Sequence, residues 1–185
     1  YPQTQAILNE VLVHAADLGP PGLTTTTTLG PTTTTLPPTT TTAEPCSGVY
    51  SFASPVAAGA SSSMNSSYAA EFAIDGNPYT SWSSIQCNGC SNTNLLNEGT
   101  FLELDLGERK CIKDIKILHD GYWSNGISFD IQAVEADGIG NTSLQTVYSG
   151  NMGTVTGGVG APVDQRWKTF SFAETKARYI RLDFT

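Results

Sequence analysis

The feature that most constrains this chain is a low-complexity segment over residues 19–45, which contains little besides Thr and Pro. Such a segment has too little apolar side-chain surface to form a core, and its residues favour an extended, polyproline-like backbone. A packed domain must therefore come from the sequence on either side. We expect three parts: a short apolar segment at residues 1–18, a linker at 19–45 and a globular domain at 46–185.

Threonine- and proline-rich tracts are typical of O-glycosylated stalks, although the composition of this one also fits a bare disordered spacer. Two Asn-x-Ser/Thr sequons, at Asn65 and Asn141, add candidate N-glycosylation sites. We predict a glycoprotein with covalent glycans on both types of site. The candidate O-glycosylation sites are the threonines of three runs: Thr24, Thr25, Thr26, Thr27, Thr28, Thr32, Thr33, Thr34, Thr35, Thr39, Thr40, Thr41 and Thr42.

Composition and charge exclude several classes of function. The formal net charge is −8, and the few cations do not form the basic stripe that nucleic-acid binding requires. No apolar run approaches the length of a membrane span. The sequence has no nucleophile elbow and no paired carboxylates in a recognisable cleft motif, so we expect no enzyme activity.

The four cysteines favour disulfides and an extracellular location, because their number is even and no metal-binding pattern accompanies them. The pair Cys87 and Cys90 resembles half of a zinc ribbon, but no second Cys-x-x-Cys follows. Four cysteines allow three pairings, and the sequence does not choose between them. We favour Cys87 with Cys90, because this short loop pair leaves Cys46 and Cys111 to fasten the start of the domain.

The globular part consists of short segments with strand character, separated by clusters of Gly, Asn and Ser. Apolar and polar residues alternate in several of them, and no helix of useful length is apparent. Strands of this number and spacing predict an all-β sandwich. The expected strands are Phe101–Leu106, Cys111–Leu118, Phe129–Glu135, Leu144–Tyr148, Trp167–Phe172 and Tyr179–Phe184.

Several motifs, in order, resemble those of the discoidin or coagulation-factor C-type domains. The stretch SSS…YAAEFAIDGNPYTSW at residues 61–82 resembles the N-terminal signature of that family. FLELDLG at 101–107 and IKDIKI at 112–117 resemble the next two strands, and KARYIRL at 176–182 resembles the penultimate one. The resemblance covers essentially all of residues 46–185. It implies an all-β, galactose-binding-like jelly roll that binds glycans, phospholipid surfaces or proteins through loops at one end.

The resemblance also implies a structural calcium ion at the Asp-Gly-Asn-x-x-Thr turn. Its ligands would be the carbonyl oxygen of Phe72 and the side chains of Asp75, Asn77 and Thr80, all of them hard oxygen donors that suit Ca²⁺. The alternative is that Asp75–Pro78 is only a turn.

The family pattern continues after the penultimate strand into a last strand of the form Ile-x-Glu-Ile-x-Val, whose Glu completes the calcium site. This sequence reaches Thr185 without such a strand. The apolar segment near the other end resembles it, with Glu10 in the place of the metal-binding Glu. A helical stripe fits the same residues, but the β-branched side chains and the resemblance favour a strand. The expected assembly strand is Ile7, Leu8, Asn9, Glu10, Val11, Leu12 and Val13.

Three arrangements of this strand remain open. It could complete the sandwich of a neighbouring copy, as in donor-strand complementation, it could belong to a covalent tandem repeat, or it could fold into its own domain. At about 3.1 Å per residue the linker reaches about 80 Å, which permits all three. The main hypothesis is an extracellular, non-enzymatic fibre in which the chain is its own head-to-tail partner.

The alternative hypothesis is a lectin-like module that binds external carbohydrate. Tyr122 and Trp123 offer aromatic rings on an expected loop, and His119 lies just before them. Tyr122 or Trp123 could equally belong to the core, which is the commoner place for an aromatic beside a strand.

Overall fold

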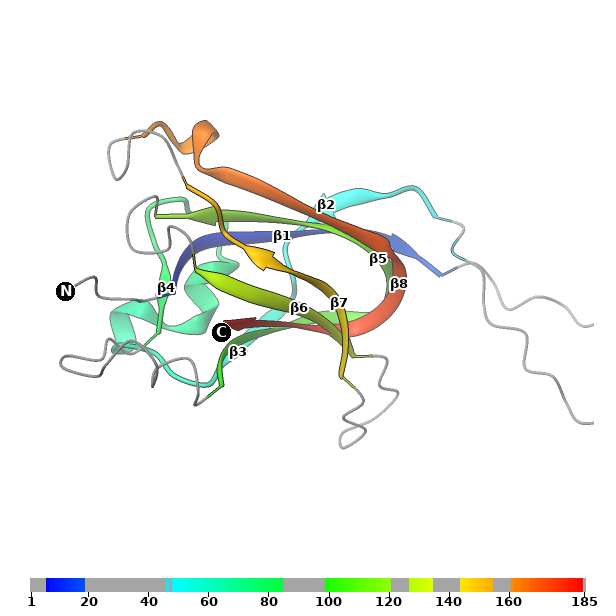
Figure 1. Ribbon diagram of the computed structural model, residues 1–185, viewed down its shortest axis with the longest axis horizontal. Helices are drawn as coiled ribbons and strands as arrows, with labels where there is room; N and C mark the ends of the chain where they lie inside the picture. Colours follow the sequence, from blue (N-terminus) through cyan, green and yellow to red (C-terminus); the bar gives the residue numbers. More distant parts are fainter. Residues whose placement is uncertain are drawn as a thin grey trace, which may run out of the picture.

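A computed structural model describes residues 6–18, 46, 48–84, 99–120, 127–134, 144–154 and 161–184. In these ranges the chain is built of β-strands and short 3₁₀ helices (Figure 1). The 3₁₀ helices are η1 (Ser66–Tyr68), η2 (Ala70–Ala73) and η4 (Val163–Gln165). The strands are β1 (Ile7–Asp17), β2 (Ser51–Ala53), β3 (Ala57–Ala60), β4 (Trp82–Ser83), β5 (Thr100–His119), β6 (Ser128–Val134), β7 (Leu144–Asn151) and β8 (Trp167–Phe184).

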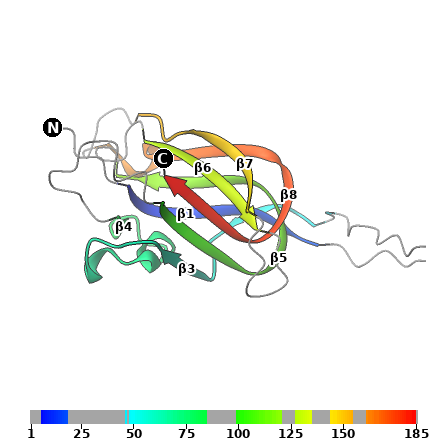
Figure 2. The same ribbon diagram turned by 60° about the horizontal axis from the view of Figure 1, so that its bottom comes forward.

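The strands pair in the order β2-β1-β5-β8-β6-β7, with β3 added beside β5 and β4 beside β1. All of these pairings are antiparallel. Two long strands, β5 and β8, run through both halves of this sheet and curve strongly (Figure 2). The sheet thereby folds over on itself into the two layers of a β-sandwich, as the sequence predicts.

The curvature of β5 and β8 has a local cause in β5. The ladder between these strands shifts register between Asp105 and Lys110 and again between Ile112 and Asp114. Gly107 lies in the first of these irregularities with a φ of 81°, a conformation that suits glycine. Bulges of this kind bend a strand and let it pass from one layer to the other. The sequence predicted two strands at this place, and another two in β8, because the bends resemble turns.

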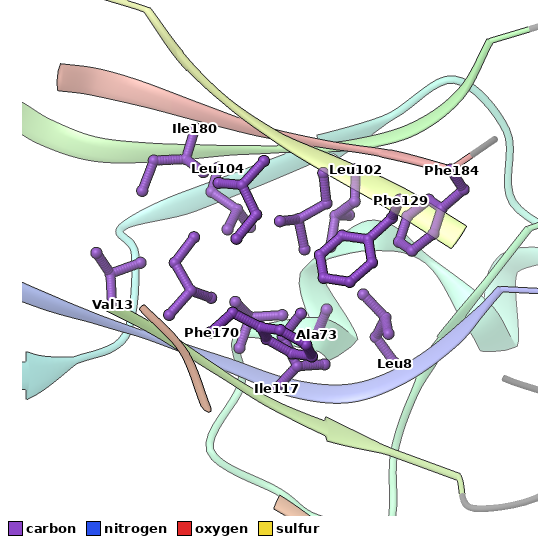
Figure 3. Close-up of a cluster of buried hydrophobic side chains, with 14 of the residues drawn as sticks. Leu8, Val13, Ala73, Leu102, Leu104, Ile117, Phe129, Phe170, Ile180 and Phe184 are labelled. Atoms are coloured by element: carbon purple, nitrogen blue, oxygen red, sulfur yellow. The ribbon is translucent and has the colours of Figure 1, made fainter. Parts of the chain in front are cut away.

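The core lies between the two layers (Figure 3). Leu8 and Val13 of β1, together with Ile117 of β5, project from one layer. Phe129 and Phe184 come from the other layer, with ring centroids 6.0 Å apart. Alternation along each strand places the intervening polar residues on the two outer faces.

β1 is a strand rather than a helix, which confirms that part of the prediction. It lies in the sheet of its own chain and pairs with β5, from Leu8 opposite His119 to Asp17 opposite Lys110. Leu8 and Val11 are completely buried. This is the third of the three arrangements that the sequence left open.

The two ends of the Thr/Pro-rich segment lie close together. Leu18, just before it, forms a bridge with Cys46, just after it. Cys46 is joined by a disulfide to Cys111, with 5.8 Å between the Cα atoms, as the favoured pairing predicts. A Cβ on Gly48 would lie 2.9 Å from the backbone nitrogen of Asp17, so this close approach requires glycine. Residues 19–45, Cys87 and Cys90 lie outside the described residues.

A further polar contact fixes β1 on the outer face of its layer. His14 Nδ1 lies 2.7 Å from Asp114 Oδ2, and the His14 ring stacks on Phe52 with centroids 4.4 Å apart. These residues come from β1, β5 and β2, so the contact crosses three strands.

In the parts of the chain that the structure describes, no helix is long and apolar enough to cross a membrane.

Replacing Leu8 by Ala is expected to lower the free energy of unfolding by about 2–5 kcal/mol, because it leaves a cavity between the layers. The measurement is urea unfolding followed by intrinsic fluorescence. Leu12→Ala removes the same atoms from a side chain on the opposite face of β1 and serves as the control. Equal losses in the two variants would contradict the placement of β1 in the core.

Candidate functional site: the bulge of β1 and the turn at Asp75

The site begins with an irregularity in β1. The register with β5 shifts between Leu8 and Glu10, so Asn9 is an extra residue in the ladder. Such a bulge interrupts the strict alternation of faces. As a result Leu8 and Val11 both reach the core, while the polar residues Asn9 and Glu10 between them are only 8% and 4% exposed.

The turn that follows η2 meets this bulge. Asp75 Oδ1 accepts a hydrogen bond from the Asn77 amide at 2.9 Å, and Asp75 Oδ2 accepts one from Thr80 Oγ1 at 2.7 Å. Asn77 Oδ1 in turn accepts one from the Tyr79 amide at 3.1 Å. Gly76 adopts a φ of 76°, which allows the chain to reverse here. These local bonds gather several oxygen atoms on one short segment.

Glu10 joins the turn from β1. Its Oε2 accepts a hydrogen bond from the Gly76 amide at 2.8 Å, whereas its Oε1 is buried and accepts no hydrogen bond of good geometry among the described residues. Burial raises the pKa of Glu10 to about 7; the bond from Gly76 lowers it in part, the negative charge of Asp75 raises it further, and a weaker interaction with the Ser54 hydroxyl lowers it. A buried carboxylate oxygen without a hydrogen bond of good geometry is the feature that a bound cation would satisfy.

The donor set of this site suits calcium. The described residues contain no group of three or more His, Cys, Asp or Glu side chains that could hold a metal. The site offers instead two carboxylates, Glu10 of β1 and Asp75 of the turn, and the amide and hydroxyl oxygens of Asn77 and Thr80. The predicted carbonyl ligand Phe72 lies in η2, just before the turn. Calcium accepts such mixed oxygen ligands, whereas zinc prefers nitrogen and sulfur. The residues present therefore fit the ion that the resemblance implies.

A second set of hydrogen bonds extends from the turn to the end of β5. The Asn9 side chain donates from Nδ2 to the Thr80 carbonyl at 2.9 Å and accepts at Oδ1 from Arg166 Nη2 at 2.8 Å. Arg166 Nε donates to the His119 carbonyl at 3.0 Å. This network links β1, the turn, η4 and the last residue of β5 at one end of the sandwich.

Of the residues predicted to contact sugar, the structure describes only His119, the last residue of β5 at this end of the sandwich. The side chain of His119 is completely buried, and its pKa is lowered by that burial. Tyr122 and Trp123 follow it in sequence and lie outside the described residues. Tyr79 of the turn is 83% exposed, which places an aromatic ring on the surface at the same end. The structure does not test the sugar-binding prediction.

Three residues of this region have positions or contacts that the sequence does not predict. The sequence predicts Asn9 only as part of a strand, gives no sign of a contact for Arg166, and predicts Tyr79 only as part of a turn. Arg166 could not be paired from sequence, because its partner Asn9 is 157 residues away. The signal for Tyr79 was present, since a large aromatic in a polar turn has no core to enter.

The sequon at Asn65 lies on the surface. Asn65 is exposed and caps η1 by accepting a hydrogen bond at Oδ1 from the Ser67 amide at 2.8 Å. The cap uses only Oδ1, so Nδ2, the atom to which a glycan is attached, takes no part in it. Asn141 lies outside the described residues.

Comparison with known families identifies the fold. The family model described as F5/8 type C domain matches residues 57–185. The chain therefore belongs to the F5/8 type C domain family, as its resemblance to discoidin domains predicts. No curated protein sequence matches the chain.

Three solved structures of similar fold are described as binding modules. Chitosan-binding module 2 of a chitosanase/glucanase from Paenibacillus sp. IK-5, in complex with chitotriose, aligns with a TM-score of 0.50 and 24% identity over 72% of this chain and 85% of the module. Module 1 of that enzyme aligns with a TM-score of 0.50 and 23% identity over 72% and 83%. The CBM32 of AlyQ, in complex with 4,5-unsaturated mannuronic acid, has a TM-score of 0.48 and 29% identity over 71% and 83%. At this level the first two support the galactose-binding-like fold.

We predict that Glu10 makes the metal-free protein less stable at higher pH. Because folded Glu10 holds its proton more tightly than the unfolded chain does, stability is lost as the pH rises from about 4.5 through about 7. Thermal unfolding in a chelator should show this loss for the native sequence and not for Glu10→Gln. The exposed Glu71→Gln is the control and should behave like the native sequence. Identical pH profiles for all three would contradict the placement of Glu10.

Proposed function

We propose that this chain is an extracellular, non-enzymatic carbohydrate-binding module whose sandwich is stabilised by one calcium ion. The observation that carries the proposal is the hydrogen-bonded end of the sandwich, where the Asp75 turn, the β1 bulge and the start of β8 are fastened together. Membership of the F5/8 type C family supports the proposal, since domains of this family bind their ligands through loops at one end of the sandwich.

The calcium ion would be held by Glu10, Asp75, Asn77, Thr80 and the Phe72 carbonyl. When bound, it would supply positive charge to two carboxylates that otherwise repel each other. Its role would be structural: Glu10 lies on β1 and Asp75 on the turn, so shared coordination would tie the strand to the rest of the domain. Any ligand that binds only the folded state raises the free energy of unfolding. At ligand concentrations well above the dissociation constant, the gain grows with the logarithm of their ratio.

Carbohydrate is the ligand class that the comparisons suggest for testing. The two Paenibacillus modules are named as chitosan-binding, and one of them is in complex with chitotriose. In the present chain, the exposed ring of Tyr79 would offer a surface on which a sugar could stack. Aromatic faces bind apolar sugar faces, while polar side chains around them select among hydroxyl groups. The sequence adds Tyr122 and Trp123, with His119 buried beneath the same end.

An extracellular location follows from the same proposal. The Cys46–Cys111 disulfide is of a kind that persists in oxidising compartments. The exposed sequon at Asn65 and the Thr-rich linker are compatible with glycosylation there.

Binding to a glycan array that includes chitotriose tests the carbohydrate proposal. We expect binding that falls at least tenfold on Tyr79→Ala, which removes an exposed aromatic ring from the turn, and on Trp123→Ala, which removes an aromatic ring that the sequence predicts on a loop. Phe52→Ala is the control, since Phe52 is an exposed aromatic that pairs with His14, far from the turn along β1. Equal loss in all three variants, or no binding to any glycan, would refute the assignment.

Head-to-tail assembly into a fibre is a second proposal, and one observation favours it. β1 is buried in the sheet, and in sequence the long segment 19–45 separates its C-terminal end from the other strands. A strand attached in this way can exchange between copies, and a non-closing exchange produces a fibre.

Light scattering after size-exclusion chromatography tests the exchange. The fibre proposal predicts large particles for the full chain and small ones after deletion of residues 1–17. Particles of the same size with and without this segment would exclude exchange of β1. The carbohydrate proposal does not depend on this result.

A further inference from the structure

The buried contact between Arg166 and Asn9 lies just behind the proposed calcium site. Arg166 is 9% exposed and Asn9 is 8% exposed, although both side chains are strongly polar. Arg166 has no carboxylate within ion-pair distance among the described residues, and its printed partners are the Asn9 side chain and the His119 carbonyl. A desolvated guanidinium without a counter-charge costs free energy, so a role beyond stability has to be considered.

The hydrogen bonds fix the orientation of the Asn9 amide. A guanidinium can only donate, so the atom of Asn9 that faces Arg166 must be the oxygen. The amide nitrogen then faces the Thr80 carbonyl, which can only accept. A free Asn side chain could rotate or flip, whereas this one is set by partners on both sides.

Two neighbouring residues of the bulge therefore hold the two ends of the turn. Asn9 binds the carbonyl of Thr80, and Glu10 binds the amide of Gly76, at 2.9 Å and 2.8 Å. Because the residues are adjacent, the position of the Asn9 backbone determines where the Glu10 carboxylate enters the turn. Among the described residues, the Asn9 side chain has one hydrogen-bond partner besides Thr80, and it is Arg166.

We propose that Arg166 is a positioning residue for the calcium site and acts through Asn9. The guanidinium holds the bulge in place, the bulge directs Glu10 toward Asp75, and the oxygen donors are thereby set before the ion arrives. This inference rests on the calcium ion proposed above. It adds a coupling between the metal site and the His119 carbonyl at the end of β5, which Arg166 binds with its second donor.

Residues that orient metal ligands without touching the metal usually contribute about 10–100-fold to its affinity. We therefore expect Arg166→Met to weaken Ca²⁺ binding by about that factor in isothermal titration calorimetry of the full chain. Asn9→Asp is a second variant: it keeps the acceptor for Arg166 but loses the donor to Thr80, and it should weaken binding as well. Arg166→Lys keeps one donor and should lose less than Arg166→Met.

Two controls separate positioning from a general loss of stability. Arg181→Met removes a guanidinium that bonds Glu103 on the outer face of the other layer, and it should bind Ca²⁺ as the native chain does. Ile131→Val removes a buried methyl group away from the turn and matches a moderate loss of stability. The proposal is overturned if Arg166→Met keeps native affinity, or if either control weakens binding as much as Arg166→Met.

Hydrogen exchange in the presence of a chelator tests, without the metal, whether Arg166 and the β1 bulge hold the turn in place; these contacts are called the clamp. The Gly76 amide bonds Glu10 and the Thr80 amide bonds the Asn77 carbonyl, so both should exchange slowly in the native chain. Arg166→Met should speed both by at least tenfold and leave the amides of β6 unchanged; unchanged exchange at Gly76 overturns the clamp. If the native chain binds no Ca²⁺, the calcium proposal and the positioning role both fail. If the native chain binds Ca²⁺ and the Arg166 and Asn9 variants bind it with the same affinity, only the positioning role of Arg166 is refuted.

Discussion

The pairing of β1 with the second half of β5 is the contact on which the rest of this domain depends. Without it, β5 would present an unpaired edge and the core would lose Leu8, Val11 and Val13 from one layer. Exposed edges of this length invite pairing with other chains. The same strand provides Glu10 and Asn9. The insertion of β1 into the sheet therefore completes the core and brings these two polar residues to the turn.

The chain reaches this arrangement by an unusual route. β1 comes first in sequence, and the Thr/Pro-rich segment separates it from all other strands. The segment leaves and rejoins the sandwich at neighbouring residues, Leu18 and Cys46, beside the disulfide to Cys111. Closing a long flexible loop costs only slightly more than closing a short one. The sandwich can therefore carry this insertion without a change in its strand pairing.

Several parts of the fold could be predicted from sequence for identifiable reasons. The alternation in FLELDL and IKDIKI predicts strands, and the resemblance gives their order and the place of residues 7–13. The continuity of β5 could not be predicted, because Gly107 and its polar neighbours have the composition of a turn while the backbone forms a bulge. Of the site, the turn at Asp75 and the approach of Glu10 follow from the family pattern. The Asn9–Arg166 bond does not, since no local signal links residues so far apart in the chain.

The end of β8 lies near the start of β1, because Trp82 contacts both. The rings of Trp82 and Phe184 lie 5.8 Å apart, and Trp82 pairs with Leu8. A connection of about six residues from the end of β8 to Ala6 spans at most about 20 Å, which suffices for neighbouring elements. β1 thus occupies the place of a strand that would follow β8.

The most direct test of this account is a permuted chain in which residues 46–185 are followed by residues 1–18 and the segment 19–45 is removed. Its unfolding free energy, from urea denaturation of the oxidised protein, should lie within about 1 kcal/mol of that of the native chain, since the same strands pair and only the connection between them changes. Residues 46–185 alone should unfold far more easily. A permuted chain as unstable as the one without β1 would contradict the claim that β1 completes the sandwich.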